Sequence, residues 1–294
     1  MISSFQKVAV IGAGQMGNGI AHVFAQSGYD VHLIDISQAA LDRGLATIAK
    51  NADRQVSKGI LAADDKTAML ARIQLHTDLA AAVADRDIVV EAATENVDLK
   101  LQIFRNLAAA APESAILATN TSSISITRIA AVTGRSQRVI GMHFMNPVPV
   151  MKLVEVINGY DTALEVTEAV VALSKDLGKT PVVVNDYPGF IANRILMPMI
   201  NEAIYALYEG VAGVEEIDTI MKLGMAHPMG PLRLADFIGL DTCLSILRVL
   251  HDGFGNPKYA PCPLLVNMVA AGHLGDKTRR GFYDYSQDPI RPVR

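Results

Sequence analysis

Two side chains in neighbouring apolar segments have the types needed for proton transfer. His143 follows the apolar run at 139–142, and Glu155 lies within the run at 153–157. Imidazole exchanges protons near neutral pH, and a carboxylate bonded to its second ring nitrogen holds the tautomer that acts as a base. A glutamate inside an apolar strand is costly unless it has a partner. From these residues alone, a catalytic pair and a structural ion pair are equally good interpretations, because two separate strands need not bring the side chains together.

A glycine-rich loop near the start of the sequence has the spacing of a phosphate-binding turn. Residues 12–17 read Gly-Ala-Gly-Gln-Met-Gly, after an apolar β-branched run and before a helical pattern, which matches G-x-G-x-x-G in its required context. In such a loop Gly12 permits the tight turn, Gly14 lets a pyrophosphate approach the backbone, and Gly17 lets the helix pack closely on the strand. The N–H groups at the start of that helix attract the phosphates. The motif therefore predicts a dinucleotide site.

Asp35 indicates which dinucleotide is bound. It ends the second predicted strand 18 residues after Gly17, close to the usual spacing of about 20. There a carboxylate accepts hydrogen bonds from the adenosine ribose and repels a 2′-phosphate, and positions 36 and 37 hold Ile and Ser rather than Arg. We therefore expect NAD(H) in preference to NADP(H). The alternative interpretation is a glycine turn in which Asp35 caps the following helix.

Composition disfavours several classes of protein. Of the 294 residues, 50% are apolar and 19% are charged, which favours a large core over disorder. A net charge of −4 provides no basic excess for nucleic acid, and no apolar run reaches the roughly 18 residues of a membrane helix. Cys243 and Cys262 form no disulfide framework, and the seven histidines lack metal-ligand spacing. We expect a cytoplasmic protein with no metal, no nucleic-acid partner and no membrane partner.

Apolar runs alternate with helical patterns in the first part of the chain, which predicts a mostly parallel sheet. From Pro188 onward only helical patterns follow. The expected fold is an α/β Rossmann-type dinucleotide-binding domain at residues 1–186, followed by an all-α C-terminal domain at residues 187–294. The predicted strands are 8–11, 30–34, 87–90, 115–118, 139–142, 153–157 and 182–184, and the predicted helices of the second domain are 190–208, 214–223, 239–250 and 264–271.

One segment of the sequence resembles the signature of a known family. Residues 141–156 read Gly-Met-His-Phe-Met-Asn-Pro-Val-Pro-Val-Met-Lys-Leu-Val-Glu-Val. They resemble the L-3-hydroxyacyl-CoA dehydrogenase family, in particular its bacterial 3-hydroxybutyryl-CoA dehydrogenase branch. The likeness spans essentially the whole chain and is also carried by residues 120–123, 186–194, 227–231 and 277–283. The resemblance implies NAD-dependent oxidation of an (S)-3-hydroxyacyl-CoA, most typically 3-hydroxybutyryl-CoA, to the 3-ketoacyl-CoA, and the reverse reduction.

The resemblance also implies a role for each matching catalytic residue. His143 corresponds to the family's general acid and base, and Glu155 to the carboxylate that orients it. Ser122 corresponds to the residue that hydrogen-bonds the substrate oxygen. Asn193 corresponds to a residue of the second domain that completes the site, so the chemistry is expected between the two domains.

Cofactor and coenzyme A contacts follow from the same resemblance. The cofactor residues implied are Gly12, Gly14, Gln15, Met16, Gly17, Asp35, Glu95, Lys100, Ser122, Asn146 and Lys277. The coenzyme A contacts implied are Asn51, Lys58 and Ser122. At position 158 this sequence has Asn where mitochondrial members have Lys, so no charged contact is expected there. The stretch 190–250 has more apolar positions than one helix layer buries in a monomer, which predicts a homodimer through the helical domain.

Simpler alternatives exist for the protein and for single residues. A related gulonate-type 3-dehydrogenase would keep the glycine loop and His143 without using a thioester, and a non-catalytic NAD-binding protein would keep the fold alone. Ser122 has the type and position of a helix N-cap for the pattern that starts at Ile124. Likewise, Glu95 is placed to satisfy a backbone N–H at a strand end, and Lys58 to be a solvated charge.

Overall fold

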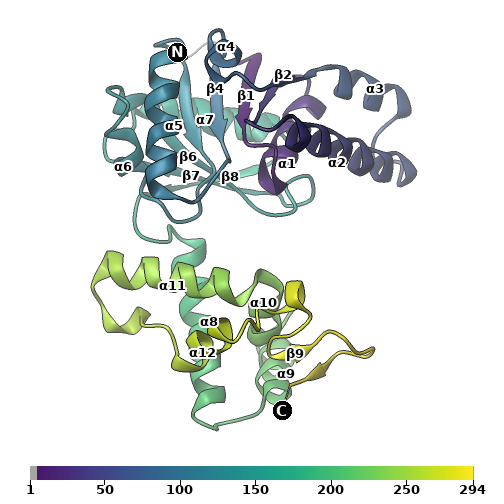
Figure 1. Cartoon of the computed structure of the whole chain (residues 1–294), viewed down its shortest axis with the longest axis vertical. Coiled ribbons are helices and arrows are strands. Elements are labelled where there is room, and N and C mark those ends of the chain that lie inside the picture. Colours follow the sequence, from purple (N-terminus) through teal and green to yellow (C-terminus); the bar gives the residue numbers. More distant parts are fainter. Residues whose placement is uncertain (1–4, 294) are drawn as a thin grey trace. The chain divides into compact units, whose positions relative to one another are not determined.

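The computed structural model describes residues 5–293, which divide into two compact units between Tyr187 and Pro188. Each unit has its own hydrophobic core. Figure 1 shows the first unit as a sheet flanked by helices and the second as a group of helices. Within the described residues, no helix is both long and apolar enough to cross a membrane.

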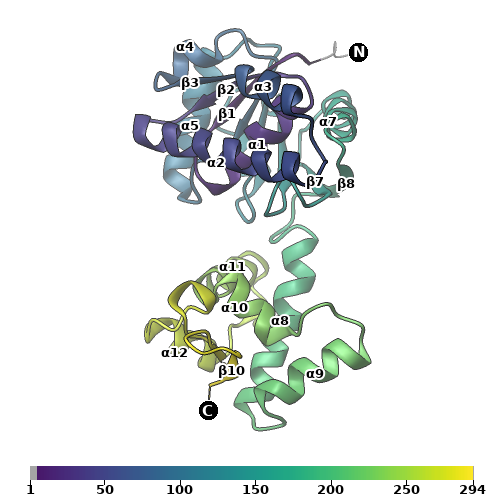
Figure 2. The same ribbon diagram turned by 90° about the vertical axis from the view of Figure 1, so that its right-hand side faces the viewer.

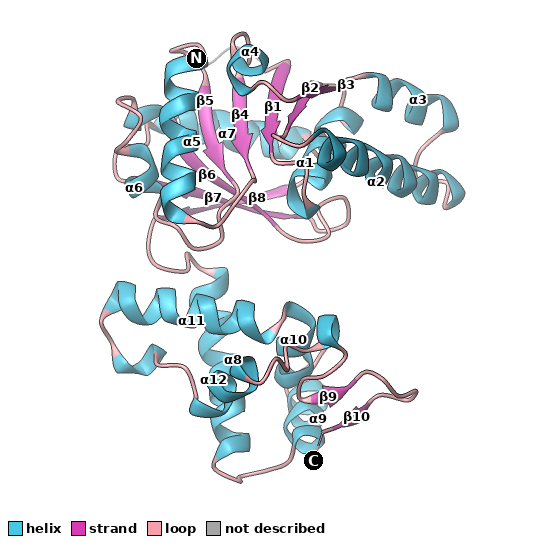
Figure 3. Cartoon of the chain, in the orientation of Figure 1, coloured by secondary structure: helices cyan, strands magenta, loops and turns pink. Residues whose placement is uncertain are grey.

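The first unit is built on an eight-stranded sheet in the order β3-β2-β1-β4-β5-β6-β7-β8 (Figure 3). Neighbouring strands are parallel except β6 and β7, which pair antiparallel. As a result, the carboxyl ends of β1, β4, β5 and β6 lie at one edge of the sheet. The strands are β1 Lys7–Ile11, β2 Asp30–Ile34, β3 Ile73–His76, β4 Ile88–Glu91, β5 Ile116–Thr119, β6 Val139–Phe144, β7 Leu153–Asn158 and β8 Thr180–Asn185.

Helices cover both faces of this sheet, with α5 and α7 on opposite faces (Figures 1 and 2). Alternate strand residues such as Val8, Val10 and Met142 pack with apolar side chains of α1, α2, α3 and α7. The other face meets α4, α5 and α6. The helices are α1 Gln15–Gln26, α2 Gln38–Ser57, α3 Ala63–Ala71, α4 Leu79–Val83, α5 Val97–Ala110, α6 Ile126–Ala130 and α7 Leu164–Asp176, with a 3₁₀ turn at Ser136–Arg138.

The second unit packs five helices around an apolar core and ends in a small antiparallel hairpin. Two buried carboxylates tie this hairpin to the helices. Asp218 accepts the hydroxyl of Tyr283, and Asp236 accepts the backbone N–H of Tyr283. The elements are α8 Ala192–Tyr208, α9 Val214–Gly224, α10 Pro231–Ile238, α11 Leu240–Phe254 and α12 Pro263–Ala270, strands β9 Tyr283–Asp284 and β10 Arg291–Pro292, and 3₁₀ turns at Pro257–Tyr259 and Asp276–Thr278.

The predicted fold class is confirmed: a Rossmann-type parallel sheet with helices precedes a helical domain. Several details differ. The half-buried edge strand β3 was not predicted, and neither was the terminal hairpin. The predicted strand at 139–142 ends too early, because β6 continues to pair with β7 as far as Phe144. The predicted helix at 190–208 starts too early, because Gly189 and Phe190 adopt positive φ angles of 74° and 49°, which a helix does not allow.

Candidate active site

The two strands with the proton-transfer residues form a hairpin that places His143 directly opposite Glu155. Antiparallel pairing of β6 with β7 sets this register, and the ring Nδ1 of His143 lies 2.8 Å from Oε2 of Glu155. Both residues are buried, with 9% and 3% of their surface exposed. His143 alternates with Met142 and Phe144, so it lies on the sheet face that α5 and α6 cover. The sequence pattern had placed His143 just after this strand, but the residue lies inside β6.

The contact between His143 and Glu155 decides which ring nitrogen carries the proton. An ionised carboxylate only accepts hydrogen bonds, so the hydrogen between the two groups belongs to Nδ1. The lone pair of the neutral ring is then on Nε2, the atom that exchanges a proton with a reacting group. The same carboxylate stabilises the imidazolium once Nε2 is protonated.

A buried asparagine fastens the neighbouring strand ends to this hairpin. The side-chain oxygen of Asn120 accepts the backbone N–H of Phe144 at 2.8 Å, and the backbone N–H of Asn120 donates to the backbone carbonyl of Glu91 at 2.7 Å. The carboxyl ends of β4, β5 and β6 are therefore held together by one residue. No role was predicted for Asn120, although it starts the Asn-Thr-Ser-Ser segment that resembles the family.

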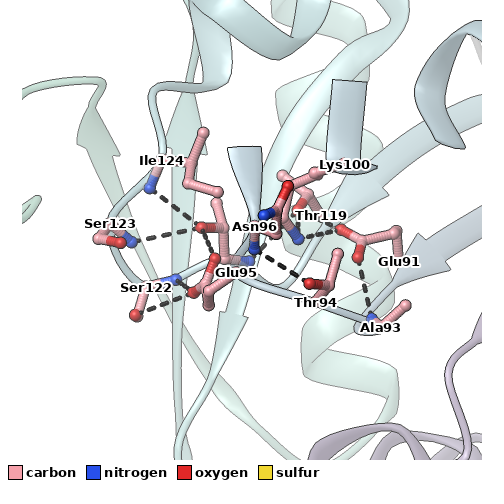
Figure 4. Close-up of polar contacts among 11 residues, drawn as sticks. Glu91, Ala93, Thr94, Glu95, Asn96, Lys100, Thr119, Ser122, Ser123 and Ile124 are labelled. Carbon is pink, nitrogen blue, oxygen red and sulfur yellow. Dashed lines mark hydrogen bonds and ion pairs between the residues drawn. The ribbon is translucent and has the colours of Figure 1, made fainter. Parts of the chain in front are cut away.

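Glu95 organises the loop that carries Ser122 (Figure 4). Its Oε1 accepts the backbone N–H of Ser122 at 2.7 Å and the Ser122 hydroxyl at 3.0 Å, while Oε2 accepts the hydroxyl of Thr121 at 2.7 Å. Ser122 is not the N-cap of the next helix. That position belongs to Ser125, whose hydroxyl accepts the N–H of Arg128 at the start of α6.

Beneath this loop lies a buried ion pair between Lys100 of α5 and Glu91 at the end of β4 (Figure 4). The exposed fractions of the two side chains are 1% and 0%. Glu91 also accepts the hydroxyl of Thr119 at 2.9 Å and the N–H of Ala93 at 2.9 Å, so its carboxylate has several donors. Lys100 was predicted as a cofactor contact from the family resemblance, whereas Glu91 belongs to none of the sequence motifs and was not predicted.

The glycine loop has the local geometry that the motif predicts. Gly12 has a φ of +97°, and a β-carbon there would come within 2.7 Å of the carbonyl oxygen of Ala92. A β-carbon on Gly17 would lie 1.7 Å from the Gly12 carbonyl oxygen, which shows how closely α1 packs on the loop. A β-carbon on Gly14, by contrast, would have no neighbouring atom within 4 Å. The loop is thus closed towards the sheet and open at Gly14.

Asp35 supports this loop from the end of β2. Its Oδ2 accepts the backbone N–H of Ala13 at 2.9 Å, and its Oδ1 accepts that of Ser37 at 3.0 Å. The N-cap of α2 is Ser37, so the alternative in which Asp35 caps that helix is wrong. Each carboxylate oxygen keeps a second lone pair for a ribose hydroxyl.

A cavity of about 310 Å³ joins the glycine loop to the Glu95 and Lys100 cluster. The start of α1, which has no side-chain cap, contributes backbone N–H groups. The open backbone at Gly14, the helix start and the carboxylate of Asp35 fit the pyrophosphate and ribose of a dinucleotide. The lining residues are Gly14, Gln15, Met16, Ala92, Ala93, Thr94, Glu95, Lys100, Asn120 and Thr121.

Family models match both units of the chain. The model of the 3-hydroxyacyl-CoA dehydrogenase NAD binding domain matches residues 7–187, and that of the 3-hydroxyacyl-CoA dehydrogenase C-terminal domain matches residues 189–285. The chain belongs to the 3-hydroxyacyl-CoA dehydrogenase family. It is therefore an NAD-dependent dehydrogenase, as the resemblance implied, and NAD is the dinucleotide that the glycine loop and Asp35 predicted.

Individual relatives support the family over the full length. A 3-hydroxybutyryl-CoA dehydrogenase of Bradyrhizobium diazoefficiens is 57% identical over 294 residues, covering 100% of both chains. The mitochondrial hydroxyacyl-coenzyme A dehydrogenase of Rattus norvegicus is 45% identical over 286 residues, covering 95% of this chain and 90% of that one. The crystal structure of (S)-3-hydroxybutyryl-CoA dehydrogenase from Ralstonia eutropha matches with a TM-score of 0.94 and 54% identity, covering 97% of this chain and 100% of that one.

The remaining predicted residues of this dehydrogenase lie on other segments of the two units. Asn146 is exposed in the connection between β6 and β7. Asn51 is half-buried on α2, and Lys58 is exposed at the end of that helix. In the second unit, Asn193 is buried in the first turn of α8, and Lys277 donates to Asp241 at 2.7 Å.

Proposed function

We propose that this chain interconverts (S)-3-hydroxyacyl-CoA and 3-ketoacyl-CoA with NAD, and that its substrate is the four-carbon 3-hydroxybutyryl-CoA. The observation that carries the proposal is the buried pair of His143 and Glu155 at the sheet edge where the glycine loop also lies. Support for the four-carbon substrate comes from relatives at 50–57% identity that are named 3-hydroxybutyryl-CoA dehydrogenase.

Proton transfer in this reaction belongs to the histidine. Oxidation of the 3-hydroxyl releases a proton as the hydride leaves C3, and Nε2 of His143 accepts that proton. Glu155, bonded to Nδ1, stabilises the resulting imidazolium. In the reducing direction Nε2 returns the proton to the alkoxide. NAD supplies the other half of the chemistry when bound, since its nicotinamide ring accepts or returns the hydride.

Other residues bind and orient the reactants. Ser122 hydrogen-bonds the substrate oxygen, while Glu95 holds the serine's loop in place. Asn193 completes the site from the second domain. Asn51 and Lys58 contact coenzyme A, the lysine through its charge on a phosphate. The cofactor is held by the glycine loop, Asp35, Glu95, Lys100, Ser122, Asn146 and Lys277.

A direct absorbance assay of NADH oxidation tests this function. Purified protein is mixed with acetoacetyl-CoA and NADH, and the loss of the nicotinamide absorbance is followed. We expect turnover with the thioester and none when free L-gulonate and NAD⁺ are supplied instead. Turnover of gulonate alone would replace the proposal with the sugar-acid alternative. Binding of NADH without turnover of either compound would favour a non-catalytic protein.

We also propose that the chain works in the cytoplasm as a homodimer, with residues 1–186 binding NAD and residues 187–294 contributing to substrate binding and dimerisation. Several large apolar side chains of the second unit are exposed, which supports an interface there. They are Ile195, Tyr208, Val211, Ile220, Leu223, Met225 and Phe237. Size-exclusion chromatography with light scattering tests the dimer, and a monomer at micromolar concentration would overturn it.

A further inference from the structure

The connection between the two catalytic strands contains a tight turn at residues 147–151. The backbone N–H groups of Val150 and Met151 both donate to the carbonyl of Pro147 at 2.9 Å. The turn follows Asn146 directly and leads into β7, which carries Glu155. Its position therefore determines where Asn146 lies relative to the sheet.

Lys179, just before β8, binds this turn through two main-chain oxygens. Its Nζ donates to the carbonyl of Val148 at 2.5 Å and to that of Met151 at 2.8 Å. The neighbouring N–H of Thr180 donates to the carbonyl of Lys152 at 2.7 Å, so the lysine is anchored beside the turn. Lys179 is half-buried, and this burial lowers the pKa of its ammonium from the ordinary value.

The glycine-loop helix α1 holds the same turn from another side. A β-carbon on Gly19 would come within 2.9 Å of the β-carbon of Val148, and within 3.7 Å of Pro149. Val148 is 2% exposed and belongs to the core that α1 shares with the sheet. The turn is therefore packed on α1 and hydrogen-bonded to Lys179.

Strand directions place these contacts at the dinucleotide edge of the sheet. Because β7 runs antiparallel to β6, the starts of β7 and β8 lie at the edge where β1, β4, β5 and β6 end. The glycine loop follows β1 at that edge. Lys179 is thus beside the cofactor edge, although it belongs to none of the sequence motifs.

We propose that Lys179 is a positioning residue, which fixes the turn at 147–151 and through it holds Asn146 in place to contact the bound cofactor. The inference rests on the proposed function only for the contact made by Asn146. The register of His143 with Glu155 depends on the β6–β7 ladder instead. Loss of the lysine therefore weakens cofactor binding more than it slows the chemical step.

Variants of Lys179, alone and combined with Asn146→Ala, test this role. Lys179→Met removes both charged hydrogen bonds, and we expect the Kd and KM for NADH to rise about tenfold while kcat changes less than about threefold. Lys179→Arg keeps a charged donor and is expected to recover most of the binding. The matched control is Lys175→Met on α7, an exposed lysine whose loss should leave NADH binding unchanged. In the Asn146→Ala background, Lys179→Met is expected to add less than about twofold, because both changes act through one contact.

Gly19→Ala displaces the turn from the α1 side and does not depend on how well Lys179→Met folds. Alanine favours a helix, so α1 itself is not weakened, and we expect the Kd for NADH to rise here too. The proposed role of Lys179 is wrong if Lys179→Met and Gly19→Ala bind NADH like the wild type. It is also wrong if the losses of NADH affinity caused by Lys179→Met and Asn146→Ala multiply in the double variant. NADH binding is measured by its fluorescence without acyl-CoA, so a wild type that binds NADH but leaves acetoacetyl-CoA unreduced would refute the proposed function alone.

Discussion

At the scale of single residues, the charged groups around the cofactor edge are fixed by specific partners. Glu155 holds His143, Glu95 holds the Ser122 loop, and Asp35 holds the backbone of the glycine loop. Each carboxylate thus positions another group, and only His143 needs to change its protonation during turnover. Substitutions at these positions should therefore affect different kinetic constants.

Substituting His143 tests the proton-transfer step alone. His143→Gln keeps a side chain of similar size and polarity but removes the group that accepts the proton. We expect kcat for acetoacetyl-CoA reduction to fall by roughly 10²–10⁴, the usual contribution of a general acid or base, while the Kd for NADH stays the same. Stopped-flow or steady-state absorbance gives the rate, and NADH fluorescence gives the binding. Turnover at the wild-type rate would remove His143 from its role.

Substituting Asp35 tests cofactor choice. Asp35→Ala removes the ribose acceptor, one hydrogen bond to the glycine loop at Ala13 and one to the backbone of Ser37 at the start of α2. We expect kcat/KM with NAD⁺ to fall about tenfold, a size typical of losing one or two charged hydrogen bonds, and the preference over NADP⁺ to narrow. Asp42→Ala, which removes an equal charge from the exposed surface of α2, is the control. A wild type with the higher kcat/KM for NADP⁺ would contradict this account of Asp35.

At the scale of elements, some features could be read from the sequence and others could not. The strand at 30–34 was predicted with its observed ends, because a short, mostly apolar run follows the glycine turn at Gly28. The meeting of His143 with Glu155 was left open, although the eight residues between β6 and β7 are too few for a parallel crossover and favour a hairpin. By contrast, Glu91 and Lys179 act through contacts that are distant in sequence, and no local pattern marks them.

The buried ion pair between α5 and β4 should matter for stability. Lys100→Met leaves the carboxylate of Glu91 buried without its counter-charge, and removal of one partner of such a pair typically costs about 3–5 kcal/mol. We expect the free energy of unfolding in urea to fall by about that amount, and the double variant Glu91→Gln/Lys100→Met to recover most of it. The exposed Lys175→Met should have no effect. A double variant no more stable than Lys100→Met would show that the unpaired charge of Glu91 is not the cause of the lower free energy of unfolding.

The packing of α1 on α2 should make the first unit sensitive to acid. His22 of α1 is fully buried, and its Nε2 lies 3.1 Å from the side-chain oxygens of both Gln26 and Gln55. Both partners are acceptors, so Nε2 carries the proton, and within the described chain Nδ1 has no hydrogen-bond partner. Burial lowers the pKa of His22 below its ordinary value of 6.5. The unfolded chain therefore takes up a proton at a higher pH than the folded chain does.

It follows that the stability contributed by neutral His22 is fully present above about pH 6.5 and is lost as the pH falls below it. One proton gives a slope of at most about 1.4 kcal/mol per pH unit in the free energy of unfolding. Urea titrations between pH 5 and pH 8 should show this slope, and His22→Gln should flatten it. A residual slope is expected from His76, whose pKa burial also lowers. If the free energy of unfolding of His22→Gln depends on pH as steeply as that of the wild type, groups other than His22 cause the acid sensitivity.

At the scale of the whole molecule, large apolar side chains are exposed on both units. On the second unit these side chains lie on or next to α8, α9 and α10. The predicted homodimer would bury these side chains. Which of the apolar positions face the core and which face a partner could not be assigned from periodicity, since a core face and an interface face have the same apolar pattern.

A charge placed on the exposed apolar surface of the second unit should therefore dissociate the proposed dimer. Leu223 on α9 is 81% exposed, and in a two-fold interface a lysine there would be desolvated in both copies. We expect Leu223→Lys to halve the mass measured by light scattering at micromolar concentration. Leu164→Lys is the control, because this leucine is 72% exposed in the first unit and should leave the dimer intact. A dimeric Leu223→Lys variant would place the interface away from α9, because two buried ammonium groups cannot be accommodated without a large loss of affinity.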